Sequence, residues 1–183
     1  MATNFPGSLD SFTNPTSGST LDSPSHAAQH ANINDAVEAV QAKLGVGAGT
    51  IGEWTAFTPS WTNLTVGNGA QTFNYAQVND VVHVQFRLTL GSTTSVGSSP
   101  YFALPVASSG YVTYHSLGVA AFYDVGTAVY VGFVAYFASG DSAILRRSVV
   151  SGSNLSSAGL SSVNPFTWAT GDQMMGQLTY RAA

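Results

Sequence analysis

The sequence predicts a mainly β protein, in which an extended N-terminal arm and one short α-helix precede an antiparallel, jelly-roll-like β-sandwich. From Trp54 onwards, short runs of β-branched and aromatic residues alternate with turn residues. Only the segment 23–45 has helical periodicity, and residues 2–24, rich in Pro, Ser, Thr and Gly, show neither a helical nor a strand period. The chain therefore divides into an arm (1–24), a helix (25–45), a glycine-rich hinge (46–53) and a sandwich domain (54–183).

The composition fits one domain whose surface is partly covered by other chains. The 183 residues are 44% hydrophobic, which is enough for one core. Only 8% are charged, against about 25% in an average soluble domain, so hydroxyls, amides and backbone must cover the surface. The net charge of −4, with five basic residues, argues against nucleic acid as a partner. The lack of cysteine excludes disulfides, thiolate catalysis and cysteine-bound metals.

The N-terminus does not resemble a signal peptide, because a basic start and an apolar run are both missing from MATNFPGSLDSF. No stretch approaches the roughly 18 apolar residues of a membrane helix, so membrane insertion is not expected. If the protein acts outside a cell, we expect it to leave as part of an assembled particle.

The arm carries isolated apolar residues along a polar segment. These residues are Phe5, Leu9, Phe12 and Leu21. One interpretation is a floppy tail with incidental apolar residues. The other is an anchor that becomes ordered when these side chains enter grooves on a partner, a mode that costs ordering entropy but covers a large surface.

The helix is predicted to begin with Ser23 as N-cap and Pro24 in the first helical position, and to end before Gly45. A start at Asn32 is the alternative. Apolar residues four, three and four positions apart form a coiled-coil seam. The seam consists of Ile33, Val37, Val40 and Leu44. Two heptads are too short to be stable alone, so the helix must either pack on its own β domain or bundle with other copies.

The β region contains six clear strand candidates. They are residues 71–78, 81–90, 118–125, 128–138, 142–150 and 174–182. In the second candidate, apolar residues at even positions from Val82 to Leu90 alternate with polar ones, as in a half-buried antiparallel strand. Hairpin turns are expected at Asn79-Asp80, Val125-Gly126-Thr127 and Ser139-Gly140-Asp141, and residues 151–162 are expected to form a long surface loop.

Three segments resemble a known group of proteins. SHAAQHANINDAVEAVQAKLG (25–45), the segment from WTAFTPSW to YFALP (54–105) and NPFTWATGDQMMGQLTYRAA (164–183) are similar to minor tail and fibre proteins of bacteriophages, especially phages of actinobacteria. The resemblance covers residues 23–183. It implies a structural virion protein without cofactors, a homotrimer attached to tail or head through other virion proteins, in some cases contacting glycans on the host surface.

The sequence holds no convincing catalytic or metal site. His26 and His30 share a helix face, as metal-ligating pairs do, but the glutamate and third ligand of a zinc-protease motif are missing, so we interpret them as polar surface residues. His83, His115, Asp80 and Asp124 lack the nucleophile elbow of a hydrolase. Glu38, Glu53 and seven aspartates, mostly at turns or in the helix, are a thin basis for a glycosidase pair. The expectation is a protein that is not an enzyme.

Aromatic residues are the remaining candidates for binding, because their faces stack on sugars and fill interfaces. The candidates for surface or glycan contact are Trp54, Trp61, Tyr123 and Tyr130. Tyr136 is expected at the surface as well, and one residue of Arg146-Arg147 should point outward while the other meets Asp141 or a neighbouring subunit. The leading hypothesis is a short phage fibre or decoration protein. The alternative is a carbohydrate-binding β-sandwich module.

Overall fold

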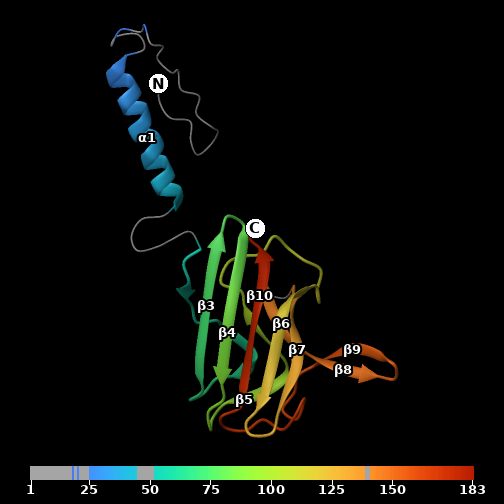
Figure 1. Ribbon diagram of the computed structural model, residues 1–183. Helices are drawn as coiled ribbons and strands as arrows, with labels where there is room; N and C mark the ends of the chain where they lie inside the picture. Colours follow the sequence, from blue (N-terminus) through green and yellow to red (C-terminus); the bar gives the residue numbers. More distant parts are fainter. Residues whose placement is uncertain (1–17, 19, 21–24, 45–51, 139–140) are drawn as a thin grey trace. The chain divides into compact units, whose positions relative to one another are not determined.

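The computed structural model describes residues 18, 20, 25–44, 52–138 and 141–183, with the side chains of residues 41–44 left out (Figure 1). The chain divides into two compact units, Met1–Gly52 and Glu53–Ala183. The predicted anchor residues Phe5, Leu9, Phe12 and Leu21 lie outside the described residues.

The first unit contains helix α1, which spans His26–Leu44. Ser25 caps it: the Ser25 hydroxyl accepts a long hydrogen bond from the Ala28 N–H (3.4 Å), and the Ser25 carbonyl accepts one from the Gln29 N–H (3.0 Å). The helix therefore begins two residues later than predicted, and the alternative start at Asn32 is wrong. It ends immediately before Gly45, as predicted. Ser23, Pro24 and Gly45 themselves lie outside the described residues.

The second unit is an antiparallel β-sheet of ten strands. The strands are β1 (Thr55–Ala56), β2 (Trp61–Thr65), β3 (Ala70–Val78), β4 (Val81–Thr89), β5 (Ser95–Ala103), β6 (Ser116–Asp124), β7 (Ala128–Phe137), β8 (Ser142–Ser151), β9 (Asn154–Gly159) and β10 (Gln173–Arg181). Their order is β1-β3-β4-β10-β6-β7-β8-β5-β2, and β9 pairs with β8 outside this path. The C-terminal strand β10 thus lies between β4 and β6 (Figure 1).

The sheet curls, so that β2 at one end of the strand order packs against β3 near the other. The Trp61 indole N–H donates a hydrogen bond to the Gln71 side chain (3.2 Å), and the Trp61 ring lies 5.9 Å from that of Phe73. The curled sheet encloses an apolar core. The predicted fold class, a mainly β, sandwich-like protein with one short helix, is confirmed.

The core is built by side chains that alternate along the strands. In β4, Val82, Val84, Phe86 and Leu88 are buried while His83, Gln85 and Arg87 are exposed, as the sequence pattern predicts. Three rings from different strands, Phe73, Phe86 and Phe102, pack together with centroids 5.2–5.3 Å apart. Gly176 lies opposite Phe86 in the register, and a Cβ there would meet the Phe86 ring at 2.9 Å. A side chain at this position is therefore excluded by the packing of the ring.

Four strands of the structure were not expected from the sequence: β1, β2, β5 and β9. The predicted loop at 151–162 is wrong, because residues Asn154–Gly159 pair with the second half of β8. Gly152, with φ 63°, forms the tight turn between the two strands. The strand NLSSAG contains few β-branched or aromatic residues, so its pairing with β8 overrides a weak local preference.

Two of the predicted hairpin turns are confirmed. Asn79 (φ 54°) joins β3 to β4 and Gly126 (φ 78°) joins β6 to β7. At the third, Asp141 has φ 51°, while residues 139–140 lie outside the described part of the chain.

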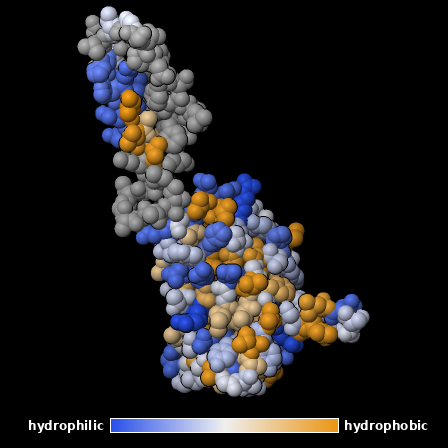
Figure 2. All heavy atoms as spheres, viewed as in Figure 1, coloured by the Kyte–Doolittle hydropathy of each residue, from blue (hydrophilic) through white to orange (hydrophobic). Residues whose placement is uncertain are grey.

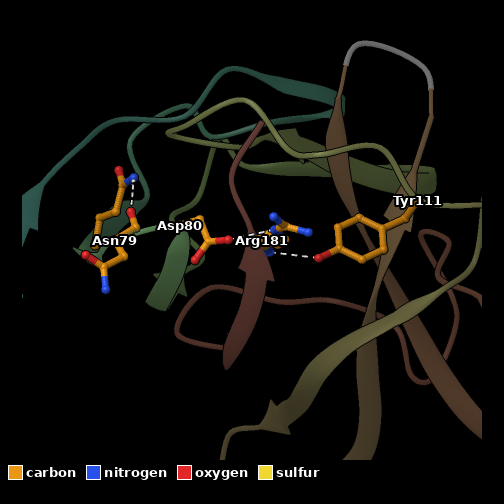
Figure 3. A network of polar contacts seen from close by, with 5 residues as sticks. Asn79, Asp80, Tyr111 and Arg181 are labelled. Carbon is orange, nitrogen blue, oxygen red and sulfur yellow. Dashed lines mark hydrogen bonds and ion pairs between the residues drawn. The ribbon is translucent and has the colours of Figure 1, made fainter. Parts of the chain in front are cut away.

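A polar network fixes the end of β10 beside the β3–β4 turn (Figure 3). The Arg181 guanidinium pairs with Asp80 at 2.6 Å, and the Arg181 backbone N–H donates to the Tyr111 hydroxyl at 2.7 Å. The Gln77 amide donates to the Asn79 carbonyl at 2.7 Å. The ion pair is exposed, so it contributes at most about 1 kcal/mol, and its main effect is to fix the geometry of the chain end.

Asp172 is a buried carboxylate, 2% exposed, that joins three segments at the opposite end of β10. It accepts hydrogen bonds from the backbone N–H groups of Val125 (3.0 Å) and Ala169 (2.6 Å). Its own carbonyl accepts one from the Leu90 N–H at 2.8 Å. The charge is therefore compensated by backbone donors, and its role is structural.

Candidate functional surfaces

The helix carries its seam at the surface. Ile33, Val37 and Val40 are 54, 50 and 43% exposed, and the side chain of Leu44 is outside the described residues. The space-filling view shows an apolar strip along α1 (Figure 2). Apolar side chains aligned on one helix face in water are a feature of helices that pack against a partner.

His26 and His30 form a close pair on the same helix. Their Nε2 atoms are 3.0 Å apart, and their ring centroids are 4.4 Å apart at an interplanar angle of 74°. His26 precedes His30 by four positions and His30 precedes Ile33 by three, so the pair continues the heptad spacing of the seam. Within the described residues, no group of three or more His, Asp or Glu side chains is arranged to bind a metal ion.

A shallow groove lies on the outer face of the sheet, across β4, β10 and β6. One hollow of about 520 Å³ reaches Val131 and Met175, and a neighbouring one of about 390 Å³ reaches Trp54. Both hollows are lined by Gln85, Val119 and Gln177, so they lie side by side on this face, and we refer to them together as the groove. Figure 2 shows apolar side chains on this face among polar ones. Val119 and Val131 are 58 and 67% exposed, so apolar surface on this face is open to solvent.

The polar groups of the groove are amides, an imidazole and a hydroxyl. Gln85 and Gln177 contribute amides, and Nδ1 of His83 is hydrogen-bonded to the Thr179 hydroxyl at 2.9 Å. The indole of Trp54, 47% exposed, lines the same end. An aromatic face beside amides and hydroxyls suits a neutral ligand that offers both C–H groups and hydroxyls.

The other aromatic candidates are less available than Trp54. Trp61 packs against the core, and Tyr130 packs on Phe166 with centroids 5.2 Å apart. The hydroxyl of Tyr123 accepts a long hydrogen bond from the Gly126 N–H (3.4 Å). The expected surface position of Tyr136 is wrong, since its side chain is buried: strand alternation places it on the same face of β7 as Val134, which belongs to the core.

The residues considered for a catalytic triad bind other groups. His83 bonds Thr179, as described above, and His115 stacks on Tyr111 with centroids 4.8 Å apart. Asp80 pairs with Arg181, and the Asp124 carbonyl accepts the Thr127 N–H of the β6–β7 turn (3.0 Å). These contacts engage the side chains of His83, His115 and Asp80 in the fold, and the main chain of Asp124 in the β6–β7 turn.

Arg146 and Asp141 do not pair with each other. The Arg146 guanidinium donates to the Ser157 hydroxyl (3.2 Å) and carbonyl (3.3 Å), and lies over the Tyr114 ring at 4.5 Å. Asp141 instead accepts from the backbone N–H (2.7 Å) and hydroxyl (2.6 Å) of Ser108. Arg146 thereby joins the β8–β9 hairpin to the segment before β6.

The β8–β9 hairpin projects from the sheet (Figure 1), and apolar residues lie on it near its tip (Figure 2). Val150 and Leu155 are paired across the two strands and are 78 and 76% exposed. Sequence reasoning missed this surface because residues 151–162 were expected to form a loop. The Gly152-Ser153 dipeptide, a two-residue hairpin turn, is the signal that identifies it.

The described residues contain no helix that is both long and apolar enough to cross a membrane. No protein-family model matches the chain, and no curated protein or solved structure is significantly similar to it.

Proposed function

We propose that this chain is a non-enzymatic structural protein of a bacteriophage particle, a short fibre or decoration on tail or head. In this proposal the arm anchors the chain to other virion proteins, helix α1 joins copies into a homotrimer, and the β domain is displayed outward. The observation that carries the proposal is the seam of α1, whose described side chains Ile33, Val37 and Val40 are about half exposed.

The free energy of burying this seam favours association. Full burial of one Val or Ile side chain contributes about 1.5–3 kcal/mol, so the exposed half of each contributes about 1 kcal/mol. For the described seam residues of one copy this amounts to about 3 kcal/mol. Because association costs at least about 4 kcal/mol, the helix needs all copies of a bundle, or further contacts, to form a stable assembly.

Other surfaces of the chain fit the same role. The apolar tip of the β8–β9 hairpin and the valines of the outer sheet face are suited to contacts with neighbouring proteins. The low charge content fits a protein held within a particle, whose solubility depends less on its own charge. The location on a phage particle is the part of the proposal that comes from the sequence motifs of residues 25–45, 54–105 and 164–183 alone.

Purified phage particles test this proposal directly. Mass spectrometry of particles from the phage that encodes the chain is expected to detect several copies per particle, and an antibody to the β domain should label tail or head in electron micrographs. Absence of the chain from particles that are otherwise complete contradicts the proposal.

A second candidate function is carbohydrate binding, favoured by the position of Trp54 beside the Gln85 and Gln177 amides. A glycan array tests it with the full chain and two variants. Trp54→Ala should abolish binding if the groove holds sugars, while Tyr114→Ala, which removes an exposed aromatic ring that does not line the groove, should leave it unchanged. No binding by the unmodified chain excludes this function for the glycans tested.

A further inference from the structure

We infer that His26 and His30 form a binding site for a divalent transition-metal ion, placed on the seam at the N-terminal end of α1. The two imidazoles are exposed and their Nε2 atoms are 3.0 Å apart. Two nitrogens that lie this close together on one face of a helix are within reach of a single ion beside it.

The distance matches the spacing that a metal ion imposes. With metal–nitrogen bonds of about 2.1 Å, two ligands at a right angle lie about 3.0 Å apart, and two at the tetrahedral angle about 3.4 Å apart. The observed 3.0 Å therefore fits adjacent positions of an octahedral or tetragonal ion without movement of the helix. A tetrahedral ion requires an adjustment of about 0.4 Å, which side-chain rotation supplies.

Imidazole nitrogen selects the class of ion. Nickel, copper, zinc and cobalt accept this ligand, whereas magnesium and calcium prefer oxygen. Two protein nitrogens leave several coordination positions for water or for ligands from another chain.

The seam identifies where further ligands would come from, a step that depends on the proposed self-association of α1. His26 and His30 take the two heptad positions that precede Ile33. In a parallel bundle, the same histidines of each copy therefore surround the axis, and the apolar residues form the layers that follow. A metal ion held there would link the copies and favour the parallel register.

A metal-free pair, in which one ring donates its N–H to the other, is the competing explanation of the same distance. The two explanations differ in their response to metal. Isothermal titration calorimetry of the full chain with Ni²⁺ distinguishes the metal site from the metal-free pair, with Mg²⁺ as the negative control.

The four histidines of the chain provide matched variants. His26→Ala and His30→Ala should each weaken Ni²⁺ binding about a hundredfold or more, because each leaves one imidazole to hold the ion without a second ligand on the same helix. His83→Ala and His115→Ala should leave the affinity unchanged. Alanine is a good helix former, so circular dichroism should show α1 intact in the first two variants. Absence of binding by the unmodified chain, or equal binding by the His26→Ala, His30→Ala double variant, overturns the inference.

Sedimentation of the full chain with Ni²⁺ and with EDTA separates this inference from the proposed function. The metal site and the self-association of α1 are both supported if Ni²⁺ shifts the chain toward a larger assembly and the His26→Ala, His30→Ala double variant does not respond. If the chain associates equally in both conditions and binds no Ni²⁺, the metal site is refuted and self-association stands. If it binds Ni²⁺ through both histidines yet remains monomeric, the metal site stands and self-association is refuted.

Discussion

Replacing Val37 by Asp places a carboxylate in the middle of the seam and should dissociate the assembly without unfolding the β domain. Val37 is 50% exposed on the helix, so about half of its side chain is available for burial in a bundle. That half contributes about 1 kcal/mol per copy. The carboxylate that replaces it loses water without gaining a partner, which costs at least a further 2 kcal/mol.

The effect multiplies with the number of copies. In a trimer the loss of about 3 kcal/mol per copy becomes about 9 kcal/mol, before the mutual repulsion of the carboxylates is added. Because 1.4 kcal/mol corresponds to a factor of ten, the association constant should fall by about six orders of magnitude.

Size-exclusion chromatography over a dilution series measures this change. Ala31→Asp is the matched control, because it adds the same charge to the same helix at an exposed position away from the seam. We expect Val37→Asp to elute as a monomer at every concentration and Ala31→Asp to elute as the unmodified chain does. If both variants keep the oligomer, the seam is not the contact between copies and the reasoning is refuted.

The fold itself makes three further predictions. Asp172→Ala removes the carboxylate that accepts two backbone N–H groups, and it should lower the free energy of unfolding by about 2–3 kcal/mol in urea titrations. Asp80→Ala should cost less than about 1 kcal/mol, and similar losses for the two variants contradict the structural role of Asp172. Gly176→Ala should lower the melting temperature by several degrees, since its Cβ collides with backbone and ring; an unchanged value argues against this packing. Burial raises the pKa of Tyr180, so its contribution to stability is complete below about pH 10 and is lost as the pH rises further. Tyr180→Phe should cost about 1 kcal/mol at pH 7 and flatten this alkaline decline, and equal slopes for the two chains would contradict it.

The sequence predicts those elements whose residues carry their own pattern. The helix has apolar residues four, three and four positions apart and β4 alternates with a period of 2, and both elements form close to the predicted residues. Strands β5 and β9 are rich in Ser and Gly, so their extended conformation depends on pairing with β8, a contact that no local pattern reports.

For the candidate surfaces, too, the sequence predicts only those features that a local pattern carries. Heptad spacing places the seam and the two histidines on one helix face, but only the structure gives the 3.0 Å between their nitrogens. The outer groove could not be predicted, because it depends on the insertion of β10 between β4 and β6. That topology brings Gln85, Val119 and Gln177 together from distant parts of the chain.

Sedimentation equilibrium of the intact chain tests the central claim, that α1 joins copies of this protein, most directly. The account predicts a molar mass near 57 kDa, three times the 19.0 kDa of one chain, which falls toward 19.0 kDa on dilution or with Val37→Asp. A mass of 19.0 kDa at all concentrations, with the unmodified chain fully folded, would contradict it.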